Sequence, residues 1–268
     1  MSTEALSEVP PGETQPARWS RFAALGLAMI GLAAFLLLAA TVVWGLDAGG
    51  ELALFIALIV LPLAGAYAVT RFGTWSKVAA IVVALLALGG MFWTAFGVSL
   101  PASFFDFVPA VLVVPGAVIA IVGSVAAMVA KRRGHASAKP ERGERRAIAI
   151  VAAVVGVLGV LSAVMSVAGS GTVDATKASA TVVFKDFKFD RSSYDVSGGT
   201  QILVTNDDPF AHTFTIDAVG LDVTLGPREQ KLIDIPSSSG TYVVYCRFHT
   251  SDPRDPTASD MASRLAIG

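Results

Sequence analysis

Long apolar segments separated by short polar stretches fill most of the chain up to about residue 170. A helix needs about 20 residues to cross a hydrocarbon core of about 30 Å. Five segments reach that length, and none contains an internal Asp, Glu, Lys, Arg or His. The pattern therefore predicts transmembrane helices over 22–46, 52–70, 77–97, 107–130 and 147–169.

The pattern changes beyond residue 180 to short runs of β-branched and aromatic residues, such as "TQILVTN", "HTFTIDAV", "KLIDIP" and "TYVVYC". Turn sequences rich in Gly, Pro, Asn, Asp and Ser separate these runs, which is typical of a small all-β sandwich or barrel. We therefore expect an α-helical membrane bundle followed by an all-β domain. The predicted domains are a tail over 1–21, a membrane region over 22–170, a linker over 171–179 and a β domain over 180–268.

Composition agrees with a membrane protein, because 54% of the residues are hydrophobic and only 15% are charged. The net charge of −1 averages two unlike parts and indicates no nucleic-acid partner. The first segment could instead be a cleavable signal peptide, but its apolar stretch is longer than the usual 7–15 residues of such a peptide. We expect an uncleaved helix.

Basic residues are distributed unequally among the loops. Two precede the first segment, two lie between the second and third, and seven lie in "KRRGHASAKPERGERR" between the fourth and fifth. The loops over 47–51 and 98–106 contain no Lys or Arg. The positive-inside rule then predicts a cytoplasmic N-terminus and, after five crossings, a β domain outside the cytoplasmic membrane. The basic loop could also bind lipid headgroups or nucleic acid, but its part in topology requires no such role.

The membrane segments offer little chemistry of their own. The three histidines of the chain are His135, His212 and His249, and all lie outside these segments. A haem held by two histidines within the bundle is thereby excluded, and intramembrane carboxylates for proton transfer are absent from the predicted segments. We interpret the bundle as an anchor, or as a docking surface for another membrane protein.

The lone cysteine, Cys246, has no partner in the chain for a disulfide. On the outer side of the membrane such a thiol is buried and inert, bonded to another protein, or a metal ligand. A tight turn would bring His249 to Cys246 at the end of a strand, and His212 begins another strand. Two imidazoles and a thiolate, with a methionine thioether available, form the ligand set that selects copper in trigonal geometry.

The C-terminal sequence resembles the cupredoxins, the blue-copper family, over roughly 180–268. In "KDFKFDRSSYDVSGGTQILVTNDDPFAHTFTI" an F-x-F strand and a Gly-containing turn lead to Asn206 and then His212. "GTYVVYCRFH" resembles the family's Cys-x-x-His segment, and "DMASRLAIG" resembles its closing strand. The resemblance implies that His212, Cys246 and His249 are copper ligands and that Met261 is the axial ligand.

The spacer "TSDPRDPTASD" between His249 and Met261 is longer than is usual in the family, and we interpret it as an insertion. Without Met261, a backbone carbonyl or water would take the axial place. The resemblance also implies that Thr213 braces the ligand loop near the sulfur. A two-copper centre is ruled out because it requires a second cysteine.

We expect one mononuclear type 1 copper ion and single-electron transfer to a redox partner protein, with no enzymatic activity. The aromatic residues Phe210, Tyr245 and Phe248 are expected to surround the ion. One alternative is a membrane-held protein that delivers or buffers copper. Another is a copper-free interaction domain of the same fold.

Overall fold

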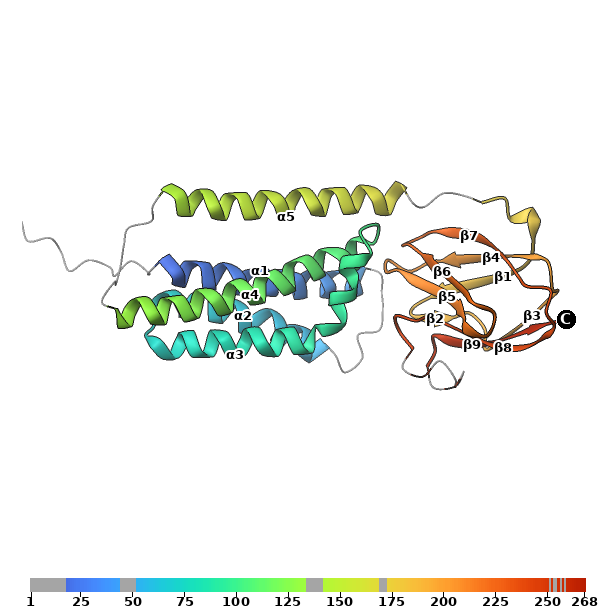
Figure 1. Ribbon diagram of the computed structural model, residues 1–268, viewed down its shortest axis with the longest axis horizontal. Helices are drawn as coiled ribbons and strands as arrows, with labels where there is room; N and C mark the ends of the chain where they lie inside the picture. The colour runs from blue at the N-terminus through green and yellow to red at the C-terminus, as the bar shows by residue number, and fades with distance from the viewer. Residues whose placement is uncertain are drawn as a thin grey trace, which may run out of the picture.

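The computed structural model contains a helical bundle followed by a β domain (Figure 1). This architecture confirms the predicted fold class. Most of the predicted tail, His135 and most of the spacer before Met261 lie outside the described residues. The structure describes residues 18–43, 52–133, 142–168, 173–250 and 259–268, together with Asp252, Asp255 and Thr257.

Five apolar helices lie close to the predicted segments. Four of them contain stretches long and apolar enough to span a membrane, and the third, with 17 residues, is shorter. Pro62 lies inside the second helix and Pro115 inside the fourth. The helices are α1 (Arg18–Val43), α2 (Leu52–Arg71), α3 (Thr74–Gly90), α4 (Phe104–Arg132) and α5 (Arg142–Ala168).

The third predicted segment is wrong at its C-terminal end. A single helix over 77–97 was expected, but α3 ends at Gly90 and a 3₁₀ helix, η2 (Phe92–Ser99), follows. Two consecutive glycines, Gly89 and Gly90, carry a high conformational entropy cost in a helix and so favour its end there. The Met91 N–H then bonds back to the carbonyls of Ala87 and Gly89 and closes the last turn.

The fourth segment begins earlier than predicted, which moves one acidic residue from a loop into a helix. The predicted start was residue 107, whereas α4 begins at Phe104 and carries Asp106 in its first turn. Asp106 accepts hydrogen bonds there from the Ser103 hydroxyl and from the Ala211 amide of the β domain.

Small residues permit very close packing between α1 and α4. A Cβ atom added at Gly26 would lie 2.3 Å from the carbonyl oxygen of Gly116, so a larger residue cannot fit there. Apolar lipid provides no hydrophobic force between helices, and close van der Waals contact at small residues replaces it.

The β domain consists of two sheets that face each other across an apolar core. One sheet has the order β2-β1-β4-β7 and the other β3-β9-β8-β5-β6. The β1–β4 and β3–β9 pairs are parallel, and the remaining pairs are antiparallel. The strands are β1 (Ala178–Lys185), β2 (Lys188–Phe189), β3 (Ser193–Val196), β4 (Gln201–Asn206), β5 (His212–Ile216), β6 (Leu221–Leu225), β7 (Gln230–Asp234), β8 (Gly240–Tyr245) and β9 (Ala262–Ile267).

The chain crosses from one sheet to the other between Asn206, at the end of β4, and His212, at the start of β5. This crossing segment lies against the helical bundle. The Phe105 and Phe210 rings lie 6.1 Å apart there, and Phe210 is buried. The β domain thus sits at the end of the bundle where α4 begins (Figure 1).

Candidate metal centre

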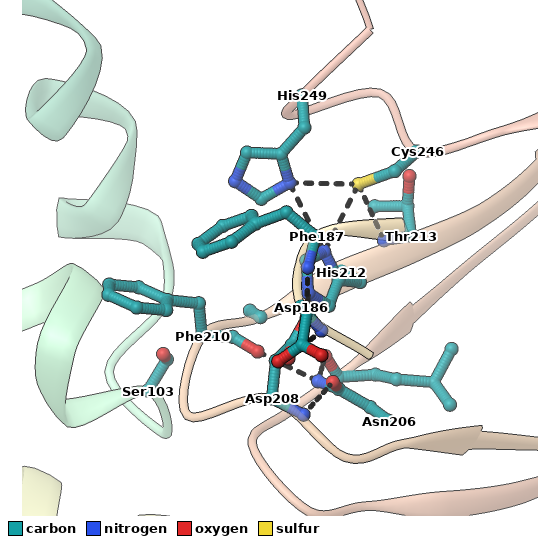
Figure 2. Close-up of polar contacts among 12 residues, drawn as sticks. Ser103, Asp186, Phe187, Asn206, Asp208, Phe210, His212, Thr213, Cys246 and His249 are labelled. Carbon is teal, nitrogen blue, oxygen red and sulfur yellow. Dashed lines mark hydrogen bonds and ion pairs between the residues drawn. The ribbon is translucent and has the colours of Figure 1, made fainter. Parts of the chain in front are cut away.

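Three donor atoms converge at this end of the β domain. His212 Nδ1 lies 3.1 Å from His249 Nδ1 and 3.6 Å from Cys246 Sγ, and the Cys246 Sγ to His249 Nδ1 distance is 3.3 Å. His212 and Cys246 are fully buried, while His249 is partly exposed (Figure 2). The structure therefore brings together the three residues that the sequence indicates.

A tight turn after β8 places Cys246 and His249 side by side. The amides of His249 and Thr250 both donate to the Cys246 carbonyl, at 3.2 and 3.0 Å. The Cys246 amide in turn donates to the Met261 carbonyl at 2.9 Å. Because β8 pairs with β5, this turn faces the His212 end of the neighbouring strand.

Thr213 braces the sulfur from β5, as the family resemblance implies. Its amide points at Cys246 Sγ from 3.3 Å, and its hydroxyl oxygen accepts the Arg247 amide at 2.7 Å. A hydrogen bond from a backbone N–H favours the charged thiolate over the thiol.

Asp208 orients His212 and was not predicted as a site residue. His212 Nε2 lies 2.8 Å from Asp208 Oδ2, so the other ring nitrogen, Nδ1, is directed toward the sulfur. The same carboxylate accepts the amides of Asp186 and Phe187, at 2.7 and 3.0 Å. These two residues have φ of 55°, a conformation that is strained for a bulky side chain.

That strained turn places the Phe187 ring against both imidazoles. Its centroid lies 4.9 Å from the His249 ring and 5.6 Å from the His212 ring, both edge to face. Among the expected aromatic neighbours, Phe210 packs on Phe187 at 5.1 Å and Phe248 lies 6.4 Å from His249. The buried Tyr245 directs its hydroxyl to Asp217.

Asn206 supports the segment that carries Asp208. Its amide nitrogen donates to the carbonyls of Phe210 and Gly226, at 2.7 and 2.8 Å, and its oxygen accepts the Asp208 amide at 3.0 Å. The family resemblance included Asn206 only as a residue that precedes His212 in the motif. Asn206 is fully buried, and its hydrogen bonds support the segment that leads to His212.

Met261 is buried directly before β9. Its carbonyl oxygen accepts the Cys246 amide and the Thr250 hydroxyl, each at 2.9 Å. The backbone of Met261 is thus held beside the ligand turn despite the long spacer. The axial role of its sulfur stays a prediction.

Cys246 and His212 stabilise each other in their charged forms. Burial disfavours the Cys246 thiolate, but hydrogen bonds from His212 and His249 outweigh burial and lower the pKa of the thiol to about 5. Burial also disfavours a charged His212, yet its hydrogen bonds to Asp208 and Cys246 raise the pKa of the imidazole to about 9. At neutral pH the metal-free centre therefore holds a thiolate ready to bind a metal ion.

These shifts predict how the stability of the metal-free protein depends on pH. The lowered thiol pKa gives stability that is lost as the pH falls through about 5, and the raised His212 pKa gives stability that is lost as the pH rises through about 9. Between pH 5 and 6.5 the thiol contribution makes the free energy of unfolding rise with pH, while the His212 contribution stays constant. Above pH 6.5 the thiol contribution rises with pH while the His212 contribution falls. We therefore expect little change in the free energy of unfolding up to pH 9.

Denaturant unfolding of the metal-free protein from pH 5 to 9 measures this profile. Cys246→Ser, which has no titrating thiol, should lack the rise between pH 5 and 6.5. Equal profiles for the two proteins would contradict the assignment of the rise to Cys246.

The donor set fits a small metal ion. With donors 3.1–3.6 Å apart, the centre of the triangle lies about 2 Å from each, close to the ~2.0–2.3 Å bonds of imidazole and thiolate to a divalent metal. The family model described as Cupredoxin-like domain matches residues 153–254. This chain carries a cupredoxin-like domain. His212, Cys246 and His249 lie within the match, and Met261 lies beyond its end.

Structures of three kinds of protein are among those similar to part of this chain. The Cu(I) form of an amicyanin variant is 13% identical, with a TM-score of 0.29, and covers 37% of this chain and 90% of its own. A copper-containing nitrite reductase from Thermus scotoductus is 18% identical (TM-score 0.26), covering 33% of this chain and 22% of its own. A purple cupredoxin from Nitrosopumilus maritimus is 17% identical (TM-score 0.25), covering 33% of this chain and 99% of its own. No curated protein sequence matches the chain.

Proposed function

We propose that this protein is a membrane-anchored, mononuclear type 1 copper protein that passes single electrons on the outer face of the cytoplasmic membrane. The observation that carries the proposal is the convergence of His212 Nδ1, Cys246 Sγ and His249 Nδ1 within a cupredoxin-like domain. Two imidazoles and one thiolate are the ligands of trigonal blue-copper sites, with a weak axial ligand completing them.

The surrounding residues suit rapid electron exchange. A copper ion bound to this ligand set would supply the one-electron redox chemistry. Asp208 fixes the orientation of His212, and the Thr213 amide stabilises the thiolate. The Phe187 ring packs against both imidazoles and helps to exclude water. A ligand geometry held in this way changes little when an electron arrives or leaves.

The fold also supports an outer location for the β domain. The start of α1, the end of α2 and the start of α3 lie at the end of the bundle remote from the β domain (Figure 1), and these turns carry Arg18, Arg71 and Lys77. Lys131 joins them there, 3.3 Å from the Thr74 hydroxyl. By the positive-inside rule the basic end is cytoplasmic. A periplasm-specific reporter fused after Gly268 should be active, whereas activity of a cytoplasm-specific reporter at this point would contradict the orientation.

Absorption and EPR spectra of the full-length protein, purified in detergent and loaded with Cu(II), test the function. We expect an intense thiolate-to-copper band that bleaches on one-electron reduction and returns on oxidation. The zinc-loaded protein, a control for the ligand cluster, should show no such band. A Cu(II) form without the band would overturn the type 1 assignment.

The same preparation separates electron transfer from copper handling. The buried His212 and Cys246 favour a tightly held ion that exchanges slowly with an added chelator. Rapid loss of the ion to the chelator, without a reversible redox cycle, would favour delivery or buffering instead.

Replacing Met261 with leucine tests the axial ligand. Leucine preserves the volume but cannot coordinate, so we expect the band to persist with a shifted wavelength and a changed reduction potential. Met165→Leu on the exposed surface of α5 is the matched control and should change neither. If Met261→Leu also changes neither, Met261 is not a ligand.

A further inference from the structure

The helical bundle touches the metal centre through a carboxylate in the first turn of α4. Asp106 Oδ2 accepts the Ala211 amide at 2.8 Å and the hydroxyl of Ser103. Ala211 is almost fully buried and directly precedes His212. A residue 105 positions earlier in the chain thus bonds to the peptide unit next to a candidate ligand.

The segment between Asn206 and His212 is held from two sides at this point. From the β domain, the Asn206 amide binds the Phe210 carbonyl at 2.7 Å. From the bundle, Asp106 binds the next amide, and the Phe105 ring packs on Phe210 at 6.1 Å. Figure 2 shows Phe210 directed toward the helical ribbon that carries Ser103, and away from the ligand cluster. With both anchors in place, the backbone entering His212 has little freedom.

The bundle also forms a wall beside the second imidazole. A cavity of about 290 Å³ is lined by Phe96, Leu100 and Asp106 from the bundle and by Phe248 and His249 from the β domain. Asp106 therefore faces both histidines: it bonds to the residue before one and shares a cavity with the other.

We propose that Asp106 is a positioning residue of the metal centre, which fixes the backbone at His212 through the Ala211 amide. This inference rests on the proposed copper function, because it assigns to the membrane bundle a part in shaping that centre. The bundle then does more than anchor the domain. Residues that bind and orient a ligand commonly alter metal affinity 10- to 100-fold when replaced, even though they do not touch the metal.

Two substitutions separate this role from a general loss of packing. Asp106→Leu removes the acceptor and leaves the buried Ala211 amide without its partner. Asp106→Asn retains an oxygen that can accept the same bond. Asp234→Leu, on the exposed surface where Asp234 accepts Gln201 Nε2 at 2.8 Å, is the matched control for loss of a carboxylate.

Hydrogen exchange at the Ala211 amide in the metal-free, full-length protein in detergent gives the first readout. We expect exchange at least tenfold faster in Asp106→Leu than in the wild type, because loss of the acceptor removes the hydrogen bond that protects this buried amide. Asp106→Asn should restore most of the protection and Asp234→Leu should leave it unchanged. Wild-type protection in Asp106→Leu would overturn the proposal.

The copper-loaded proteins give the second readout. We expect Asp106→Leu to shift the EPR copper hyperfine splitting and to release copper to a chelator at least tenfold faster, with Asp106→Asn close to the wild type. A folded Asp106→Leu protein with unchanged spectrum and release rate would overturn the positioning role. If the wild type itself lacks the thiolate-to-copper band, the proposed function fails, while the exchange data still decide whether Asp106 holds this segment.

Discussion

Cys246→Ser is expected to abolish the thiolate-to-copper band and the one-electron redox cycle of the full-length protein. The serine hydroxyl is similar in size to the thiol, so the buried position should be filled without a large cavity. Its oxygen is a hard ligand and stays protonated at neutral pH, and it cannot supply the soft thiolate that the Cu(I) state favours. Absorption spectra and a reductive titration measure the loss.

Thr250→Ser is the control for this variant. Thr250 lies on the same turn and donates its hydroxyl to the Met261 carbonyl at 2.9 Å, a bond that serine can also make. We expect Thr250→Ser to keep the band and the redox cycle. If Cys246→Ser keeps an intense visible band at the wild-type wavelength, the sulfur of Cys246 is not the source of the colour.

The elements and the clustering of three donor residues were predictable because their signals are local. Membrane helices depend on the length of an apolar run, and strands on short β-branched runs between turns. His212 begins β5, and Cys246 and His249 follow β8, so residue type, position near strand ends and the family resemblance together pointed to these three residues. The end of α3 at Gly90 also has a local cause, although the apolar pattern continues beyond it.

The residues that support the site, Phe187, Asp208 and Asp106, have no local signal in the sequence. Phe187 reaches the imidazoles only because Asp186 and Phe187 both adopt positive φ, and neither is a glycine that would reveal the turn. Asp208 stabilises that conformation through contacts more than twenty residues away. Asp106 lies 105 residues from Ala211, in a different kind of structure. These contacts follow from tertiary packing, which a reading of local patterns does not contain.

The contact between Asp106 and the Ala211 amide bears on the function of the helical bundle. The absence of ionisable residues within the predicted segments favoured an anchor or a docking surface. The structure places Asp106, a residue at the very edge of a segment, against the peptide bond that precedes His212. An anchor would tolerate any apolar sequence of the right length, whereas a bundle that shapes the metal centre requires a hydrogen-bond acceptor for the Ala211 amide at this position.

Asn206→Leu is expected to cause the largest loss of stability in the β domain. Leucine matches the size of asparagine but leaves the Phe210 and Gly226 carbonyls and the Asp208 amide without their partners in a fully buried place. Unsatisfied buried groups cost about 1–3 kcal/mol each, so three of them predict a loss of at least about 3 kcal/mol. Hydrogen exchange across β4 and β5 measures it in the full-length protein.

Gln201→Leu on the same strand is the matched amide control. Gln201 lies near the surface and makes one exposed bond to Asp234, so its loss should cost less than about 0.5 kcal/mol. Because Asn206 holds the Phe210 carbonyl, Asn206→Leu should also weaken copper binding at least about tenfold, whereas Gln201→Leu should not. Equal losses of stability in the two variants would contradict the role assigned to the three hydrogen bonds of Asn206. A stable Asn206→Leu protein with wild-type copper affinity would mean that the segment before His212 is held by the bundle side alone.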